Sequence, residues 1–201
     1  MTPSRADAPP AMPTHVRRLR RGERREQILA AATRAFARSG FAATSLDDIV
    51  GEAGISRAIL YRHFDSKTDM YRAVLDRTCG RLERTFHAGE YAMDSVAALI
   101  RAAADDPDGF RLLFRYAVRE PEFRDLTDSF AAAAIGIARH SLAAMLPDGP
   151  WTAWAAQLVP AVVIEAVIAW LDAGQPDPDQ AAERIMHAVQ GVIEAVRHRP
   201  A

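Results

Sequence analysis

The sequence predicts an all-α fold, and three observations support this prediction. Alanine, leucine and arginine are abundant, while glycine and proline gather in a few turns between apolar-periodic runs. No run of alternating apolar and polar residues bounded by hairpin turns indicates a strand. With 49% apolar and 25% charged residues over 201 positions, the chain has the composition of a folded protein with one sizeable core or two unequal domains.

The composition also favours a cytoplasmic protein. Cys79 is the single cysteine, which excludes an intramolecular disulfide and a multi-cysteine zinc site and fits a reducing compartment. Residues 1–14 are proline-rich and lack the apolar core of a signal peptide. The most apolar later run, residues 158–171, is shorter than a bilayer crossing and contains Pro160 and Glu165. We therefore expect no membrane partner.

Charge is distributed unevenly along the chain, although the net charge is only -1. Residues 1–80 contain 14 Lys and Arg against 9 Asp and Glu, whereas residues 81–201 contain 11 against 17. The first part is therefore basic and the second is acidic. Only the N-terminal part is predicted to meet an anionic partner.

The first predicted helix follows an arginine-rich segment, RRLRRGERR. Its apolar face is formed by Ile28, Ala32, Ala35 and Phe36. Gly40 suits the left-handed position at its C-terminal end. The arginines of residues 17–25 either keep a flexible arm soluble or reach DNA backbone or minor groove, and the sequence leaves both readings open.

Two short helices separated by a tight turn are predicted next. Ser45 and Asp48 can form a capping box at the start of the first, and Gly54 ends it. Ser56 can cap the second. The residues predicted to pack inward are Ile49, Ile55, Leu60 and Phe64. This arrangement is typical of a helix-turn-helix, whose second helix enters the major groove of DNA.

Longer helices are predicted in the rest of the chain. Ser66 and Asp69 can form a second capping box that starts a fourth helix. Beyond Gly80, the turn signals DDPDG, REPE, LPDGP and AGQPDPD separate helices expected at residues 95–104, 109–119, 122–146, 151–173 and 179–197. The last two carry apolar stripes that fit a four-helix bundle, and the family resemblance given below implies that this bundle joins two copies of the chain. These stripes are Val159, Val163, Ala166 and Trp170, and Ile185, Val189, Ile193 and Val196.

The segment TSLDDIVGEAGISRAILYRHFDSKTDMYRAVL resembles the DNA-binding domain of TetR-type (TetR/AcrR) transcriptional regulators. Thr, Ile, Ala-Gly, Ser, Leu-Tyr, His-Phe and Lys follow in that family's order and spacing, and the resemblance covers about residues 23–75. It implies a homodimer that binds a palindromic operator, usually as a repressor, and leaves it when a small, largely apolar effector binds. It also implies a basic arm at residues 1–20, a helix-turn-helix domain at 21–68 and an effector-binding and dimerisation domain at 69–201.

Carried over by position, the resemblance implies a set of DNA-binding residues. They are Thr44, Ser56, Arg57, Ala58, Ile59, Tyr61, Arg62, His63 and Lys67. Those expected to face base edges are Arg57, Ala58, Ile59 and Arg62, and those expected to contact phosphate are Thr44, Tyr61, His63 and Lys67. Ala58 departs from the glycine or proline common at its position, and the methyl groups of Ile59 could meet a thymine methyl.

The effector is expected to lie among aromatic residues of the C-terminal domain, although an aromatic residue taken singly is more often part of the core. The candidate lining residues are Phe86, Phe110, Phe114, Phe130 and Trp154, with His140 or Glu165 as orienting polar groups. Arg111, Arg115 and Arg119 form a column with four-residue spacing. This column is either a solvated face neutralised by acids such as Asp108 and Glu122, or an anion site.

Two other functional classes lack the sequence features that they require. A small helical enzyme with a basic surface would need catalytic motifs, and the sequence has no nucleophile elbow, phosphate-binding glycine loop or metal-ligand cluster. A sequence-neutral DNA-binding protein would need a basic surface throughout, whereas the C-terminal part is acidic. We therefore expect no catalysis, cofactor or metal, and three partners: double-stranded operator DNA, a second copy of the chain and a small-molecule effector.

Overall fold

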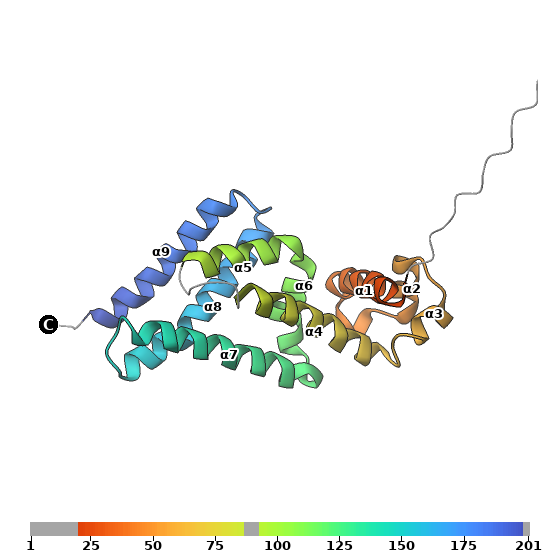
Figure 1. The fold of residues 1–201 in the computed structure, drawn as a ribbon, viewed down its shortest axis with the longest axis horizontal. Coiled ribbons are helices and arrows are strands. Elements are labelled where there is room, and N and C mark those ends of the chain that lie inside the picture. The colour runs from red at the N-terminus through yellow and green to blue at the C-terminus, as the bar shows by residue number, and fades with distance from the viewer. Residues whose placement is uncertain (1–19, 87–92, 199–201) are drawn as a thin grey trace, which may run out of the picture.

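The computed structural model describes residues 20–86 and 93–198, which are helical without strands, as predicted. Three helices form an N-terminal unit: α1 (Arg21–Ala43), α2 (Leu46–Ala53) and α3 (Arg57–Tyr61). Figure 1 shows this unit at one end of an elongated molecule, with α4 (Lys67–Phe86) running from it toward the larger C-terminal part. The fourth helix therefore connects the two parts of the protein.

The C-terminal part contains one run of short helical segments and four longer helices. Their bounds are α5 (Met93–Asp105), α6 (Pro107–Arg111), η1 (Leu112–Tyr116), η2 (Ala117–Arg119), η3 (Pro121–Phe123), α7 (Arg124–Ala143), α8 (Pro150–Asp172) and α9 (Pro178–Arg197). The single helix predicted at residues 109–119 is instead wound in succession as α, π and 3-10 helix. The other predicted helices are confirmed to within a few residues at each end.

Local signals in the sequence fix the ends of α1 and α2. The capping box is confirmed: the Asp48 amide donates to Ser45 Oγ at 3.1 Å, and the Ser45 amide donates to Asp48 Oδ2 at 2.8 Å. Gly54 ends α2 in the left-handed region at φ +62°, and Gly40 interrupts α1 at φ +77°. Only glycine adopts these angles without a steric penalty, so both positions turn the chain where predicted.

The starts of α3 and α4 also follow local chemistry. Ser56 Oγ accepts from the Ile59 amide at 3.4 Å, and Ser66 Oγ accepts from the Asp69 amide at 3.0 Å. The second capping box differs from the prediction in one bond, because Asp69 Oδ2 accepts from the Asp65 amide rather than that of Ser66. Both helices nevertheless begin where the serines predict.

Apolar residues of the N-terminal unit form the expected small core. Ile49, Leu60 and Phe64 are buried, and Ile55 is half-buried against them. They meet the buried face of α1, which is Ile28, Ala32, Ala35 and Phe36. This packing holds α3 in place and leaves its other faces to solvent.

The predicted apolar stripes of the last two helices pack against other helices of the same chain. Ile185, Val189 and Ile193 of α9 are buried, because α9 packs along α5 and α8 of the same protomer. Trp170 of α8 is also buried, and its indole donates to the Pro176 carbonyl at 2.6 Å. The prediction that these stripes join two copies was wrong, since an apolar stripe does not reveal which helix covers it. A charge at Val189 should disturb the protomer itself.

The eighth helix carries apolar surface that the chain does not cover. It is 23 residues long and contains an 18-residue window of mean hydropathy 1.8, of which only 33% is buried. Length and composition alone would let α8 cross a membrane, but one such helix is weak support for that. Trp151 and Trp154 lie on its outer side with 66% and 42% of their surfaces exposed.

Candidate DNA interface and ligand cavity

The third helix presents the side chains that the sequence predicted to face outward. Arg57, Ala58 and Tyr61 are exposed, as is Arg62 directly after the helix, while Ile59 is half-buried. Tyr61 is 51% exposed, so its ring and hydroxyl are accessible to a partner. Ser56 is exposed as well, but its hydroxyl oxygen caps the helix. This geometry is compatible with insertion of α3 into a groove.

Arg57 is held by an acidic residue of the preceding helix. Its Nε donates to Asp47 Oδ1 at 2.5 Å, and its Nη2 pairs with Asp47 Oδ2. The hydrogen bonds from Arg57 lower the pKa of Asp47, although burial opposes this in part. Both side chains are mostly exposed, and an exposed pair of this kind contributes little to stability. Arg57 is therefore pre-oriented and can exchange Asp47 for a base edge at low cost.

Thr44 does not offer its hydroxyl to a phosphate. The residue is 1% exposed, and its Oγ1 donates to the Gly40 carbonyl at 2.7 Å and lies 3.2 Å from the Ala35 carbonyl. The Gly40 carbonyl also accepts from the Thr44 amide at 3.3 Å, so both donors of Thr44 are directed at the C-terminal part of α1. The predicted phosphate contact is corrected: the Thr44 side chain closes the end of α1.

The Lys67 side chain also binds the C-terminal end of α1. Its Nζ donates to the Phe41, Ala42 and Thr44 carbonyls at 2.8, 3.2 and 3.1 Å, and lies 4.6 Å from the centroid of the Phe41 ring. A cation at a helix C-terminus compensates both the free carbonyls and the negative end of the helix dipole. With all three ammonium donors used, the predicted phosphate contact of Lys67 is likewise corrected.

His63 lies among positive charges next to α3. Its side chain is half-buried, and its pKa is lowered by burial and then by surrounding guanidinium groups. These groups belong to Arg21, Arg62, Arg25 and Arg24. Such concentrated positive charge is suited to a polyanion, which would relieve the repulsion.

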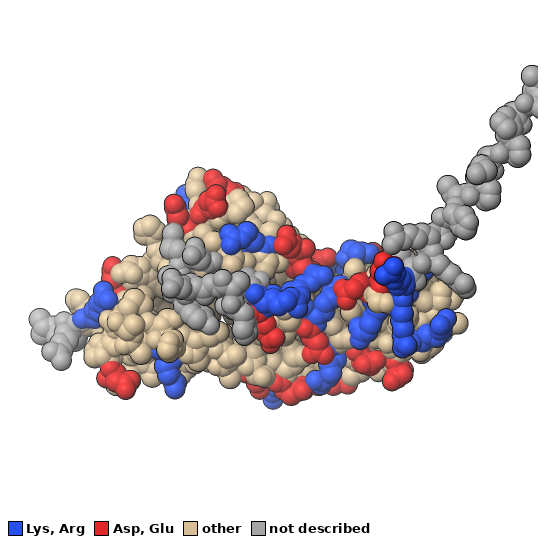
Figure 2. Space-filling model, in the orientation of Figure 1, with Lys and Arg blue, Asp and Glu red and all other residues tan. Residues whose placement is uncertain are grey.

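Some arginines of the N-terminal unit are already neutralised. Arg34 and Arg38 of α1 pair with Glu52 of α2 at 2.8 and 3.2 Å. Figure 2 shows Lys and Arg gathered over the N-terminal helices at one end, while the surface over α7, α8 and α9 at the other is mostly uncharged. The candidate DNA interface thus combines the exposed face of α3 with the arginines around His63.

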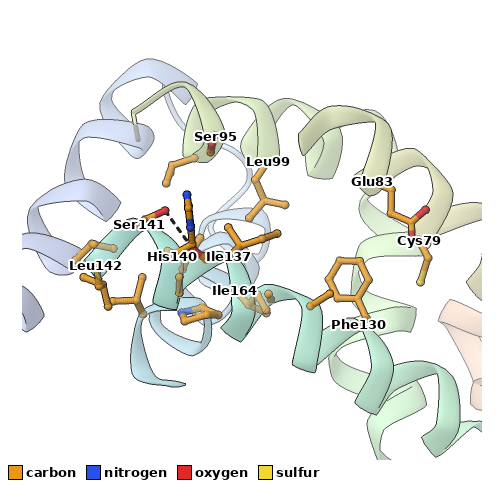
Figure 3. Close-up of a pocket in the computed structure, with 18 of the residues that line it drawn as sticks. Cys79, Glu83, Ser95, Leu99, Phe130, Ile137, His140, Ser141, Leu142 and Ile164 are labelled. Atoms are coloured by element: carbon orange, nitrogen blue, oxygen red, sulfur yellow. Dashed lines mark hydrogen bonds between the residues drawn. The ribbon is translucent and has the colours of Figure 1, made fainter. Parts of the chain in front are cut away.

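A cavity of about 1270 Å³ lies in the C-terminal part, lined by residues of α4, α5, α7, α8 and α9. Two of the predicted effector residues line it, Phe130 and His140 of α7. Figure 3 shows Phe130 and Ile137 on α7, with Leu99 of α5 across from them. The size and apolar lining suit a drug-sized molecule.

Four other predicted effector residues lie outside the cavity. Phe110 is buried in the core, and the Phe114 ring lies between those of Phe110 and Phe130, with centroids at 4.6 and 5.4 Å. Trp154 and Glu165 are on the exposed side of α8, because the helical period turns Pro160, Val163 and Ile164 toward the cavity instead. The side chain of Phe86 lies outside the described residues.

The cavity wall is mainly aliphatic, and the sequence did not single these residues out. They include Leu99, Ile137, Val163, Ile164 and Met186, from four helices. Their periodicity predicted buried faces but carried no signal that the faces leave a space between them. Cys79 also lines the cavity, and burial raises the pKa of its thiol to about 12, so it is not a reactive thiolate.

Charged groups reach the cavity from α4 and the start of α7. Arg72 binds Asp125 through two bonds, Nη1 to Oδ2 at 2.8 Å and Nη2 to Oδ1 at 3.2 Å. Asp76 and Glu83 add two more carboxylates on α4. The Ser141 hydroxyl donates to the Ile137 carbonyl at 3.1 Å, shown dashed in Figure 3, so it serves its own helix.

Two arginines of the predicted column form ion pairs with a carboxylate of the same chain. Arg111 and Arg115 both bind Asp172 at the end of α8, at 3.0 and 2.9 Å, and these hydrogen bonds lower the pKa of Asp172. The acid is thus Asp172 rather than the expected Asp108 or Glu122. Across residues 20–86 and 93–198, no group of three or more His, Cys, Asp or Glu is placed to hold a metal.

Comparison with known proteins agrees with this architecture. A family model described as bacterial regulatory proteins, tetR family, matches residues 28–74. The chain is 28% identical over 197 residues to the HTH-type transcriptional activator FasR of Mycolicibacterium smegmatis, covering 89% of this chain and 87% of that protein. It is 37% identical over 78 residues to the HTH-type transcriptional repressor Rv3405c of Mycobacterium tuberculosis, covering 39% of each.

The similarity extends to the fold of the whole chain. A solved TetR-like transcriptional regulator from Rhodococcus sp. RHA1 superposes with a TM-score of 0.73 at 21% identity, covering 86% of this chain and 97% of that one. The helix-turn-helix unit, the all-helical C-terminal part and these relatives agree. Residues 28–74 of the chain match the tetR family of bacterial regulatory proteins, and the chain as a whole is similar in fold to TetR-like transcriptional regulators.

Proposed function

We propose that this chain is a one-component repressor that binds a palindromic operator as a homodimer and releases it when a small, largely apolar molecule fills the cavity. The DNA-binding part comprises residues 21–68, with the preceding arm as a further DNA contact, and residues 69–201 bind the effector and the second copy. The observation that carries the proposal is that α4 belongs to both sites.

The two halves of α4 have different neighbours. Near its start, the Tyr71 ring lies against the Phe36 and Phe41 rings of α1, with centroids at 4.8 and 5.0 Å. Further along, Cys79 and Gly80 form part of the cavity wall. These positions are roughly 14 Å apart along one helix, at 1.5 Å per residue. A ligand that displaces the cavity half of α4 would therefore displace the DNA-binding unit as well.

A polar cluster strengthens this connection between α1, α4 and α6. Arg77 of α4 donates to Thr33 Oγ1 of α1 at 2.8 Å and pairs with Asp106, the N-cap of α6, at 3.4 Å. Its side chain is 10% exposed, so these bonds form largely away from water. Partners of a buried charge are costly to separate. We infer that α1 follows α4 when α4 moves.

The uncovered face of α8 supports a dimer. Trp151 and Trp154 would be buried by a second copy, and the exposed side of α9 carries small residues, Ala188, Gly191 and Ala195, that permit close helix approach. A two-fold axis between the copies would place the recognition helices about 34–36 Å apart, one turn of DNA. The operator would then be a palindrome.

Repression follows from occupancy of a promoter, because a bound dimer excludes the polymerase. The relatives include one protein named an activator and one named a repressor, so the direction of control is part of the proposal. We expect the protein to act in the cytoplasm and to have no catalytic activity of its own.

Selection from random duplex DNA tests this function against its rivals. The proposal predicts enrichment of a palindrome with half-sites one helical turn apart, bound by one or more dimers. A sequence-neutral binder would enrich no motif and would bind operator and random duplex equally. An enzyme with a basic surface would show only weak, strongly salt-dependent binding. Either outcome would reject the repressor.

A further inference from the structure

We propose that Asp47 is a positioning residue for DNA recognition: it holds the Arg57 guanidinium so that the free edge of this group reads a guanine in each operator half-site. The inference rests on the proposed function, because it requires a specific operator. It adds a residue of α2 to the recognition surface and names the base that the first residue of α3 selects. It is carried by the atoms through which the two side chains meet.

The Asp47 carboxylate binds one particular edge of the guanidinium. Arg57 Nε donates to Asp47 Oδ1 at 2.5 Å, and Arg57 Nη2 donates to Asp47 Oδ2. Both carboxylate oxygens are therefore bound to the edge that contains Nε. The same bonds raise the pKa of Arg57 and lower that of Asp47, so the contact joins two full charges.

This side-on contact leaves the other edge of the guanidinium available. Across the described residues, Nη1 of Arg57 makes no hydrogen bond. Arginine recognises guanine by donating to O6 and N7 together. A guanidinium has donors on both edges, so it can bind a carboxylate through Nε and Nη2 and a base through Nη1 and Nη2 at the same time. Arg57 need not give up Asp47 in order to reach a guanine.

The positions of the two residues place the free edge where a base would lie. Arg57 is the first residue of α3, directly after the Ser56 cap, and the N-terminal residues of a recognition helix are those that contact base edges. Asp47 lies in the first turn of α2. Both side chains are about 60% exposed, at 60% for Arg57 and 61% for Asp47, so the pair lies on the surface that a duplex would cover.

Holding Arg57 in advance favours a base contact over contacts with the DNA backbone. An unrestrained arginine loses rotamer freedom when it binds a base, whereas Asp47 restricts Arg57 before DNA arrives. The carboxylate also repels phosphates, which makes this arginine a poorer partner for random DNA. Arg62, also exposed beside α3, is bound by no carboxylate of the described residues and has neither property.

Asp47 has a structural role as an alternative explanation. A carboxylate in the first turn of a helix stabilises it through the helix dipole. Asp48 has a role of this kind, since it forms the capping box with Ser45. Across the described residues, the Asp47 carboxylate accepts hydrogen bonds from Arg57 alone. A purely structural role would change stability and leave the base preference of the protein intact.

Base preference at single positions provides the test. Fluorescence anisotropy gives affinities for the selected operator and for duplexes that carry each other base at one position of one half-site. The native chain should prefer guanine by about 10-fold or more at one position, and Arg57→Ala should abolish this preference. Asp47→Ala should reduce the same preference by about 3- to 10-fold, because Arg57 must then be ordered on binding. In the Arg57→Ala background, Asp47→Ala should have no further effect at that position.

Glu52→Ala is the matched control, because Glu52 lies on the same helix but pairs with Arg34 and Arg38 of α1. It removes the same charge from α2 and should leave the guanine preference within about twofold of the native value. Circular dichroism checks that each variant is folded. Asp47→Asn, which keeps the shape of the side chain, carries the same test if Asp47→Ala is unfolded.

Three results would overturn the inference: an operator without a guanine preference that depends on Arg57, a guanine preference that survives Asp47→Ala, and equal losses in Asp47→Ala and Glu52→Ala. A loss in Asp47→Ala at a position that Arg57→Ala leaves unchanged would also contradict the positioning role, because Asp47 would then read a base itself. In each of these cases a specific operator is still bound, so the proposed function stands. If the native chain discriminates at no position, the proposed function fails and the role of Asp47 fails with it.

Discussion

Replacing Lys67 by methionine should destabilise the protein and leave its DNA contacts in place. Methionine keeps the length of the side chain and removes the ammonium that donates to three carbonyls at the end of α1. The Phe41 and Thr44 carbonyls are partly buried, while that of Ala42 is exposed and can take water instead. The loss of stability therefore comes mainly from the Phe41 and Thr44 carbonyl oxygens, which are left without a donor.

The magnitude follows from these contacts. A partly buried acceptor left unpaired costs about 1 kcal/mol at the lower end of the usual range. Loss of the cation over the Phe41 ring costs about 0.5–1 kcal/mol more. We expect the free energy of unfolding to fall by about 2–3 kcal/mol, and the melting temperature by about 5–10 °C for a chain of this size.

Urea unfolding followed by circular dichroism measures the loss, and the salt dependence of operator binding provides the contrast. Arg62→Met is the matched control, because Arg62 is exposed beside α3. It should change stability by less than about 0.5 kcal/mol. Neutralising a residue that contacts one phosphate should reduce the slope of log affinity against log salt by about 0.9. If Lys67→Met instead keeps full stability and reduces that slope, Lys67 is a phosphate ligand and the capping role is refuted.

Three further changes test other parts of the structure. Tyr71→Phe should raise the free energy of unfolding by about 1 kcal/mol in urea titrations, since the buried Tyr71 hydroxyl has no hydrogen-bond partner among the described residues. A lower free energy of unfolding in this variant would show that the hydroxyl has a hydrogen-bond partner after all. Trp151→Glu with Trp154→Glu should yield helical monomers in sedimentation, and a persistent dimer would move the interface off this face. Because burial and nearby arginines lower the pKa of His63, a phosphate beside it should raise that pKa, so operator affinity should increase as pH falls toward 6. His63→Gln should remove this increase, and an identical pH profile would exclude the contact.

The sequence predicted those features that depend on neighbours a few residues away. Ser45, Ser56 and Gly54 act on backbone groups within one turn, so their roles could be read directly from their spacing. The anchors Leu60 and Phe64 were predictable because their four-residue spacing places them on one helical face. Element boundaries and the small N-terminal core followed from such signals.

Other features depend on contacts between distant segments. The oxygens bound by Lys67 lie 23 to 26 residues earlier and belong to the backbone, which carries no sequence signal. Trp154 was expected in the cavity on residue type, yet its position on α8 turns it outward. The cavity itself arises where five helices fail to close against one another, and no single helix encodes that gap.

We propose that the exposed face of α3 reads a specific operator. The direct measurement is the ratio of affinities for the selected operator and a scrambled duplex, at one fixed salt concentration, for the native chain and Arg57→Ala. The native ratio should be about 10³ or more. Arg57→Ala should lower it about 10- to 100-fold, equivalent to one lost base contact of about 1–3 kcal/mol, while affinity for scrambled DNA stays nearly constant. A native ratio close to one, or equal loss on both duplexes in the variant, would contradict the account.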